Sequence, residues 1–89
     1  MDNRSLDVEN ILDHFDFEKV HAYMRISKWT YRGEGLPSLN EIKGTARMLV
    51  EKAIYSEEEN YSTGTGGFWV FKYEYGIKLI FAIDTSSNY

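Results

Sequence analysis

The chain has 89 residues, of which 43% are hydrophobic, 27% charged and 16% aromatic, and its formal net charge is −4. This length fits one domain, and so many aromatic residues exclude a disordered chain. The acidic charge argues against a DNA or RNA polymer or an anionic membrane as the partner. Cysteine is absent, which excludes disulfides, thiolate nucleophiles and zinc–thiolate sites.

The organisation of the chain is simple. No apolar run approaches the roughly 20 residues that span a bilayer, and the N-terminus is too polar for a signal peptide. We therefore expect a single soluble, intracellular domain over residues 1–89, with a polar lead-in at 1–14 and a core at 15–84. In the lead-in a short apolar stripe of Val8, Ile11 and Leu12 has helical spacing. A domain this small is marginally stable without a disulfide, so we also expect a homo-oligomer.

The segment 16–27 predicts a helix. Asp16 is a suitable N-cap, because its carboxylate can accept the free N–H groups of the first turn. The apolar residues with helical spacing in this segment are Phe17, Val20 and Met24. After it, the aromatic and β-branched residues 29–32 predict a short strand over 28–33.

The segment 38–55 predicts the longest helix. It opens with a capping box, in which the Ser38 hydroxyl accepts from the N–H of Glu41 and the Glu41 carboxylate reaches back. Its apolar stripe consists of Leu39, Ile42, Ala46, Leu49 and Ala53. The polar residues 56–67 that follow predict a loop.

Two strands at 67–74 and 77–84 predict a terminal β-hairpin with its tip at Tyr75-Gly76, so that Val70 pairs with Phe81. The inward residues are Phe68, Val70, Leu79, Phe81 and Ile83. The outward residues are Trp69, Phe71, Tyr73 and Ile80. Either the N-terminal segment folds over this outward face, or the face is a subunit interface or ligand platform. The predicted fold is α+β, with two helices packed on a small antiparallel sheet that ends in a β-hairpin.

The strongest local signal for a ligand is the glycine- and hydroxyl-rich end of the polar loop. It consists of Ser62, Thr63, Gly64, Thr65, Gly66 and Gly67. Glycines let successive backbone N–H groups approach an anion, and the hydroxyls add donors. The alternative is a flexible connector into the hairpin.

A second signal is a local excess of positive charge in this acidic chain. Between residues 19 and 33 there are four basic residues and no acidic one: Lys19, Arg25, Lys28 and Arg32. The aromatic residues among them are Tyr23, Trp29 and Tyr31. Cations pair with phosphate and flat rings stack on bases, and Lys43 and Arg47 of the next helix can join them. The alternative is a solvated helix face with core aromatics.

Other chemistry has little support. His14, Glu18 and His21 would share one face of a continuous helix, but no further metal ligand is evident, so we expect no metal. No serine lies in a nucleophile elbow. We expect no cofactor and no enzymatic activity.

Several short motifs together resemble a family of small bacteriophage proteins. Members share a phenylalanine–acid–aromatic helix start, a W-T-aromatic element, a P-[ST]-x-x-E helix with T-A-R, and an S-T-G-G-F step into a hairpin. The matching residues here are Phe15-Asp16-Phe17, Trp29-Thr30-Tyr31, Pro37-Ser38 with Glu41, Thr45-Ala46-Arg47, and Ser62-Thr63-Gly64 with Gly66-Gly67-Phe68. The chain departs from the family by an inserted Thr65 and by Trp69 and Phe71 in place of polar outward residues.

The chain is also similar in size and style to phage proteins that sequester cyclic dinucleotides and so counter host CBASS defence. The resemblance implies an oligomeric sponge in the host cytoplasm, with no DNA, RNA or membrane partner. In that hypothesis Trp29 and Tyr31 stack on bases, Arg47 with Lys28 or Arg25 neutralises phosphate, and residues 62–67 donate hydrogen bonds. The alternative is a protein–protein inhibitor of a host defence enzyme that acts through an aromatic surface of Trp69, Phe71, Tyr73 and Ile80.

Overall fold

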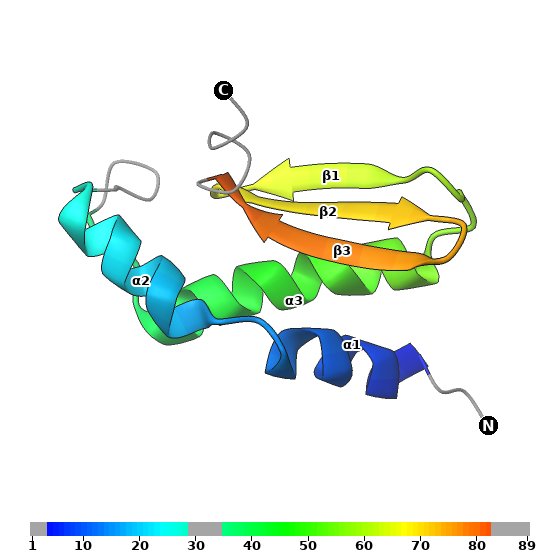
Figure 1. Ribbon diagram of the computed structural model, residues 1–89, viewed down its shortest axis with the longest axis horizontal. Coiled ribbons are helices and arrows are strands. Elements are labelled where there is room, and N and C mark those ends of the chain that lie inside the picture. The colour runs from blue at the N-terminus through cyan, green and yellow to red at the C-terminus, as the bar shows by residue number, and fades with distance from the viewer. Residues whose placement is uncertain (1–3, 29–34, 83–89) are drawn as a thin grey trace.

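The computed structural model describes residues 4–28 and 35–82. Its helices are α1 (Arg4–Asp13), α2 (Phe17–Ile26) and α3 (Leu39–Tyr55), and its strands are β1 (Ser62–Thr65), β2 (Phe68–Tyr73) and β3 (Gly76–Phe81). The strands form an antiparallel sheet in the order β1-β2-β3, with α1 and α3 under one face and α2 at one end (Figure 1). The predicted α+β class is confirmed. The strand predicted at 28–33 lies, apart from Lys28, outside the described residues.

The helices begin where their caps predict. The Asp16 carboxylate accepts a hydrogen bond from the Lys19 N–H at 3.0 Å, and the Ser38 hydroxyl accepts one from the Glu41 N–H at 3.1 Å. Each cap satisfies an N–H that has no partner inside its helix. The helical lead-in is also confirmed, because α1 brings Val8 into the core at 2% exposure.

The core lies between the helices and the inward face of the sheet. Its aromatic centre is the pair Phe68 and Phe81, whose ring centroids are 5.0 Å apart in an edge-to-face arrangement. Both rings are almost completely buried. The buried helical residues are Val8, Phe17, Val20, Met24, Ile42, Ala46, Leu49, Val50 and Ala53. The predicted stripes of α2 and α3 thus face the sheet, as amphipathic helices do.

The loop predicted at 56–67 is wrong in its second half. Ser62–Thr65 is strand β1 and pairs with Phe68–Phe71. The connecting Gly66 and Gly67 have φ angles of 58° and 90°, and a two-residue hairpin turn of the favoured type needs positive φ at both positions. Because this turn returns the chain directly onto β2, the backbone of β1 is used in the sheet.

The predicted register of the terminal hairpin is also wrong. The tip is Glu74-Tyr75, so that Val70 pairs with Leu79 and Phe68 with Phe81. Relative to the prediction, β3 is shifted by two residues, and a shift of two leaves every side chain on its own face. The prediction of which residues point inward therefore holds for the described part of the hairpin. The observed register brings the two core phenylalanines together.

Candidate functional site

The outward side of the sheet carries a surface that we call the aromatic face. It consists of Trp69, Phe71 and Tyr73 of β2, Lys78 and Ile80 of β3, and Ser62 and Gly64 of β1. The three aromatic side chains are 41%, 40% and 49% exposed. The rings of Trp69 and Phe71 lie nearly parallel, at 17° and a centroid distance of 6.3 Å. One strand thus presents a row of half-exposed aromatic rings.

Strand β1 contributes to this face by leaving room for it. Gly64 pairs directly with Trp69, and the indole lies over the glycine. A Cβ at residue 64 would lie only 2.5 Å from the Cδ2 atom of Trp69. Any side chain there would push the indole away, so the glycine lets the ring pack against the backbone of β1. The Trp69 indole is therefore packed against β1 within the chain itself.

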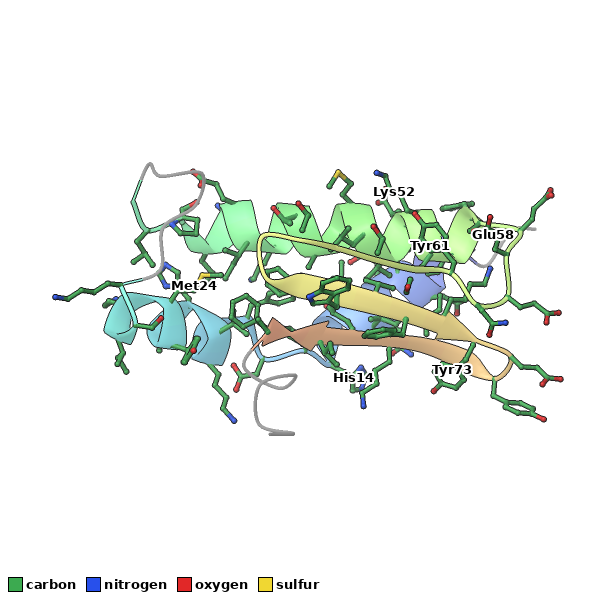
Figure 2. All side chains as sticks on the ribbon, turned by 90° about the horizontal axis from the view of Figure 1, so that it is seen from above. His14, Met24, Lys52, Glu58, Tyr61 and Tyr73 are labelled. Atoms are coloured by element: carbon green, nitrogen blue, oxygen red, sulfur yellow. The ribbon has the colours of Figure 1, made fainter. Side chains whose placement is uncertain are left out.

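The hairpin end of the aromatic face is formed by Tyr73, which Figure 2 shows at the same end of the molecule as Glu58.

On the opposite side of β2, the ammonium of Lys72 donates a hydrogen bond to the Ser56 carbonyl just after α3. The N–H of Lys72 donates to the Tyr61 carbonyl at 2.8 Å. These two bonds hold the connection between α3 and β1 against the end of the sheet.

The lead-in helix does not cover the aromatic face. Residues 4–13 form α1, which packs against α3 below the sheet, where Val8 is buried. In Figure 1 the side of the sheet away from α3 has neither α1 nor α2 over it. The interpretation in which the N-terminal segment folds over the outward face is therefore wrong for residues 4–13.

The predicted phosphate ligand Arg47 is already paired. Its guanidinium lies 2.5 Å from the Glu9 carboxylate and 3.9 Å from Glu51. The hydrogen bond with Arg47 holds the pKa of Glu9 below its usual value, and the same bond raises the pKa of Arg47. The adjoining groove, of about 400 Å³, has four carboxylates (Glu9, Asp13, Asp16 and Glu18) against two cations (Lys43 and Arg47). An anion bound here would have to displace Glu9 in acidic surroundings.

The other predicted nucleotide ligands are dispersed over the described chain. Gly66 and Thr45 line a small hollow on one side of α3. Arg47 lies two residues further along the helix, about 200° around its axis, and faces α1. Arg25 and Lys28 are exposed at the C-terminal end of α2, where Lys28 has a positive φ of 56°. Trp29 and Tyr31 lie outside the described residues.

The histidines do not form a site with Glu18. His14 precedes α2, and its Nδ1 donates to the Asn10 carbonyl at 2.7 Å. The Nε2 of His21 donates to the Pro37 carbonyl at 3.0 Å, which ties α2 to the start of α3. Over residues 4–28 and 35–82, no group of three or more His, Asp or Glu residues is arranged to hold a metal ion.

No known protein family, curated protein or solved structure matches the chain. The resemblance to phage proteins therefore stays a prediction. None of the helices within the described ranges is long and apolar enough to cross a membrane. The described residues form a small α+β fold, and one side of its sheet carries the aromatic face.

Strand alternation predicts that Trp69, Phe71, Tyr73 and Ile80 share one surface, but it does not by itself reveal how Gly64 supports that surface. The signal was present in Gly66-Gly67, a dipeptide that marks a two-residue hairpin turn. Counting outward from that turn pairs Thr65 with Phe68 and Gly64 with Trp69. Gly64 lies in strand β1, and Gly66 and Gly67 form the turn that follows it.

Proposed function

We propose that this protein acts by binding, without catalysis, and that its aromatic face binds another protein. The observation that carries the proposal is the row of Trp69, Phe71 and Tyr73 on one side of the sheet, each 40–49% exposed. With the resemblance to phage proteins, the partner we propose is a host defence enzyme in the host cytoplasm. The protein would then be an inhibitor of that enzyme.

The chemistry of the face supports a protein partner. Tryptophan and tyrosine are enriched among the residues that dominate binding energy at protein interfaces. Trp69 is already packed over Gly64, so little side-chain freedom is lost when a partner covers it. In contrast, the described cations predicted to bind phosphate are spread over α2 and α3.

The test compares Trp69→Ser with wild type. The wild-type protein is used to capture its partner from host lysate, and the affinity for the purified partner is then measured by biolayer interferometry. We expect Trp69→Ser to weaken binding by on the order of 100-fold, as loss of a central aromatic anchor does. The matched control is Met48→Ser, which removes a side chain of similar exposure (45%) from α3. A partner that binds Trp69→Ser as tightly as wild type contradicts the proposal.

A second candidate uses the same face as a platform for a cyclic oligonucleotide, as in the sponge hypothesis. The observation that favours it is the pair of nearly parallel rings with Lys78 paired directly opposite Phe71. Each stacked base contributes about 1–3 kcal/mol, and an ammonium pairs with phosphate. Because Arg47 is held by Glu9, this version of the hypothesis places the phosphate at Lys78.

Native mass spectrometry with a panel of cyclic di- and trinucleotides separates the two candidates. A retained, unmodified nucleotide that is lost in both Trp69→Ser and Lys78→Glu supports the sponge. If nucleotide retention depends on Arg47 and not on Lys78, the nucleotide binds at α3 and not at the aromatic face. A converted nucleotide would show turnover and contradict both candidates.

A further inference from the structure

Helix α2 has two apolar sides, and only one of them faces the core. Phe17, Val20 and Met24 are buried against the rest of the domain. On the other side Ala22 is exposed, and Ile26 is 82% exposed. Figure 1 shows α2 at one end of the molecule, beside the sheet.

A hollow of about 460 Å³ lies along this outer side. Its apolar walls are Phe15, Val20, Ala22, Tyr23 and Ile26, and Lys19 and Asp16 border it. The hollow is larger than an isoleucine side chain. A projecting isoleucine and a hollow that can receive one therefore occur side by side on the same helix.

One flank of α2 carries charges of opposite sign at its two ends, while Lys19 of the first turn lies on the other flank. Glu18 lies in the first turn and Arg25 in the last, both exposed, and their spacing of seven residues places them on the same flank. The helix dipole has the opposite polarity, positive at the N-terminus and negative at the C-terminus, so each of these side chains is stabilised within its own helix. A second α2 helix running antiparallel to the first would meet opposite charge at both ends.

We propose that two copies of this protein associate through α2, packed antiparallel about a two-fold axis near Ala22. Ile26 of each copy enters the hollow of the other, beside the aliphatic part of Lys19. In an antiparallel helix pair the same flanks of the two helices meet, so Glu18 of each copy lies beside Arg25 of the other. The small side chain of Ala22 lets the helices approach to about 8 Å.

A second copy is the occupant that the observations favour, because the surface is complementary to itself. A two-fold interface requires that one patch supply both the projection and the hollow, and both charges of each ion pair. The outer side of α2 supplies all of these, with Ile26 as the projection and Glu18 and Arg25 as the charges. The aromatic face stays free in such a dimer, so this inference is independent of the proposed function, and each dimer would present two aromatic faces.

The first test is sedimentation equilibrium of the full chain over a wide concentration range. We expect a reversible monomer–dimer equilibrium with a dissociation constant on the order of micromolar, as for small interfaces. Ile26→Glu is expected to weaken the dimer by roughly tenfold or more, since it places a charge in an apolar hollow. Ile26→Leu is the matched control and is expected to keep the dimer.

A charge exchange tests the antiparallel arrangement. Arg25→Glu alone brings two carboxylates together at each end and is expected to weaken the dimer several-fold. Adding Glu18→Arg restores opposite charges and is expected to recover most of the affinity. Lys52→Glu makes the same change of charge on α3 and is the control. Circular dichroism checks that each variant keeps its helices.

Three outcomes would overturn the inference. One is a chain that stays monomeric at every concentration. Another is a dimer that tolerates Ile26→Glu and shows no recovery in the exchanged pair. The third is a dimer that Trp69→Ser dissociates, which would place the contact on the aromatic face. In the first two the proposed function is untouched, because it is measured by partner affinity at Trp69.

Discussion

The two faces of the sheet carry similar apolar and aromatic residues, but one face forms the core and the other forms a half-exposed surface. Along β2, Phe68 and Val70 point inward and are 0–1% exposed, whereas Trp69 and Phe71 point outward and are 40–41% exposed. Successive residues of one strand thus belong to the core and to the candidate binding surface. Hydrophobicity alone does not separate the two roles. The alternation of the strand does, together with the position of the helices on one side.

The comparison also shows that the outward face is structured. The Trp69 indole packs on Gly64, so part of its surface is covered within the chain. Truncation of a half-exposed ring on the outward face should affect stability weakly and binding strongly, with the opposite order for a buried ring on the inward face.

The largest effect is expected for Phe81→Ala on the inward face. Phe81 is 0% exposed, and removal of a buried phenylalanine costs about 3–5 kcal/mol of unfolding free energy. That loss is comparable to the whole stability of so small a domain. Urea unfolding followed by circular dichroism measures it. The outward control, Phe71→Ala, should lower the free energy of unfolding by about 1 kcal/mol or less. A loss as large as that of Phe81→Ala would contradict the difference between the two faces.

Gly64→Ala tests the support beneath the aromatic face. Its Cβ would lie 2.5 Å from the indole of Trp69, so the ring must move. We expect a loss of about 1–3 kcal/mol in urea unfolding and a change in tryptophan fluorescence. In a Trp69→Ala background the same substitution should cost little, which isolates the contact.

Gly44→Ala is the matched control for this glycine. Nothing lies within 4 Å of a Cβ at Gly44 on α3, and alanine is the better helix former. It should stabilise the protein by about 0.5–1 kcal/mol. Equal losses at both glycines would contradict the role given to Gly64.

Lys72→Met tests the inward face at the hairpin end. The variant keeps the apolar stem of the side chain and removes the hydrogen bond from the ammonium to the Ser56 carbonyl. We expect a loss of about 1 kcal/mol, and faster amide exchange in residues 57–60. Lys78→Met on the aromatic face should leave both measurements close to wild type.

The smallest effect is expected for the exposed ion pair of Glu9 and Arg47. Because the pKa of Glu9 is lowered in the folded protein, its contribution to stability is present above the pKa of the unfolded chain. It is lost as the pH falls from about 4.5 through the lower folded value. Unfolding measured across this window should show a steeper fall for wild type than for Arg47→Met, and salt should reduce the difference. Parallel curves would show that the pair contributes nothing.

Local patterns predicted much of this protein, because local physics governs those parts. Asp16 and Ser38 cap helices with atoms a few residues away, and the stripes of α2 and α3 follow from helical spacing. The inward and outward sets of β2 follow from alternation. The register of β3 could not be predicted in this way, because both registers keep every side chain on its face. The pairing of Phe68 with Phe81 chooses between them.

The candidate nucleotide site shows the limit most clearly. Arg47 and the segment 62–67 were joined in one hypothesis, although no local pattern places α1 and β1 around α3. Glu9, which pairs with Arg47, lies on α1, a helix for which the sequence predicted only a short apolar stripe. Gly66 lies on another side of α3. Residue type predicts what a side chain can bind, while its partner in space determines whether it is available.

Local sequence patterns are sufficient to predict the α+β class, the caps and buried stripes of the helices, and the outward row of Trp69, Phe71 and Tyr73. Each depends on contacts or periodicities within a few residues, which any packing of the chain preserves. Three other features follow only from the packing of the elements: Gly64 lies under Trp69, Arg47 pairs with Glu9, and Ile26 projects beside a hollow. These depend on which surfaces meet when the elements pack, and that is set by the mutual fit of the whole core.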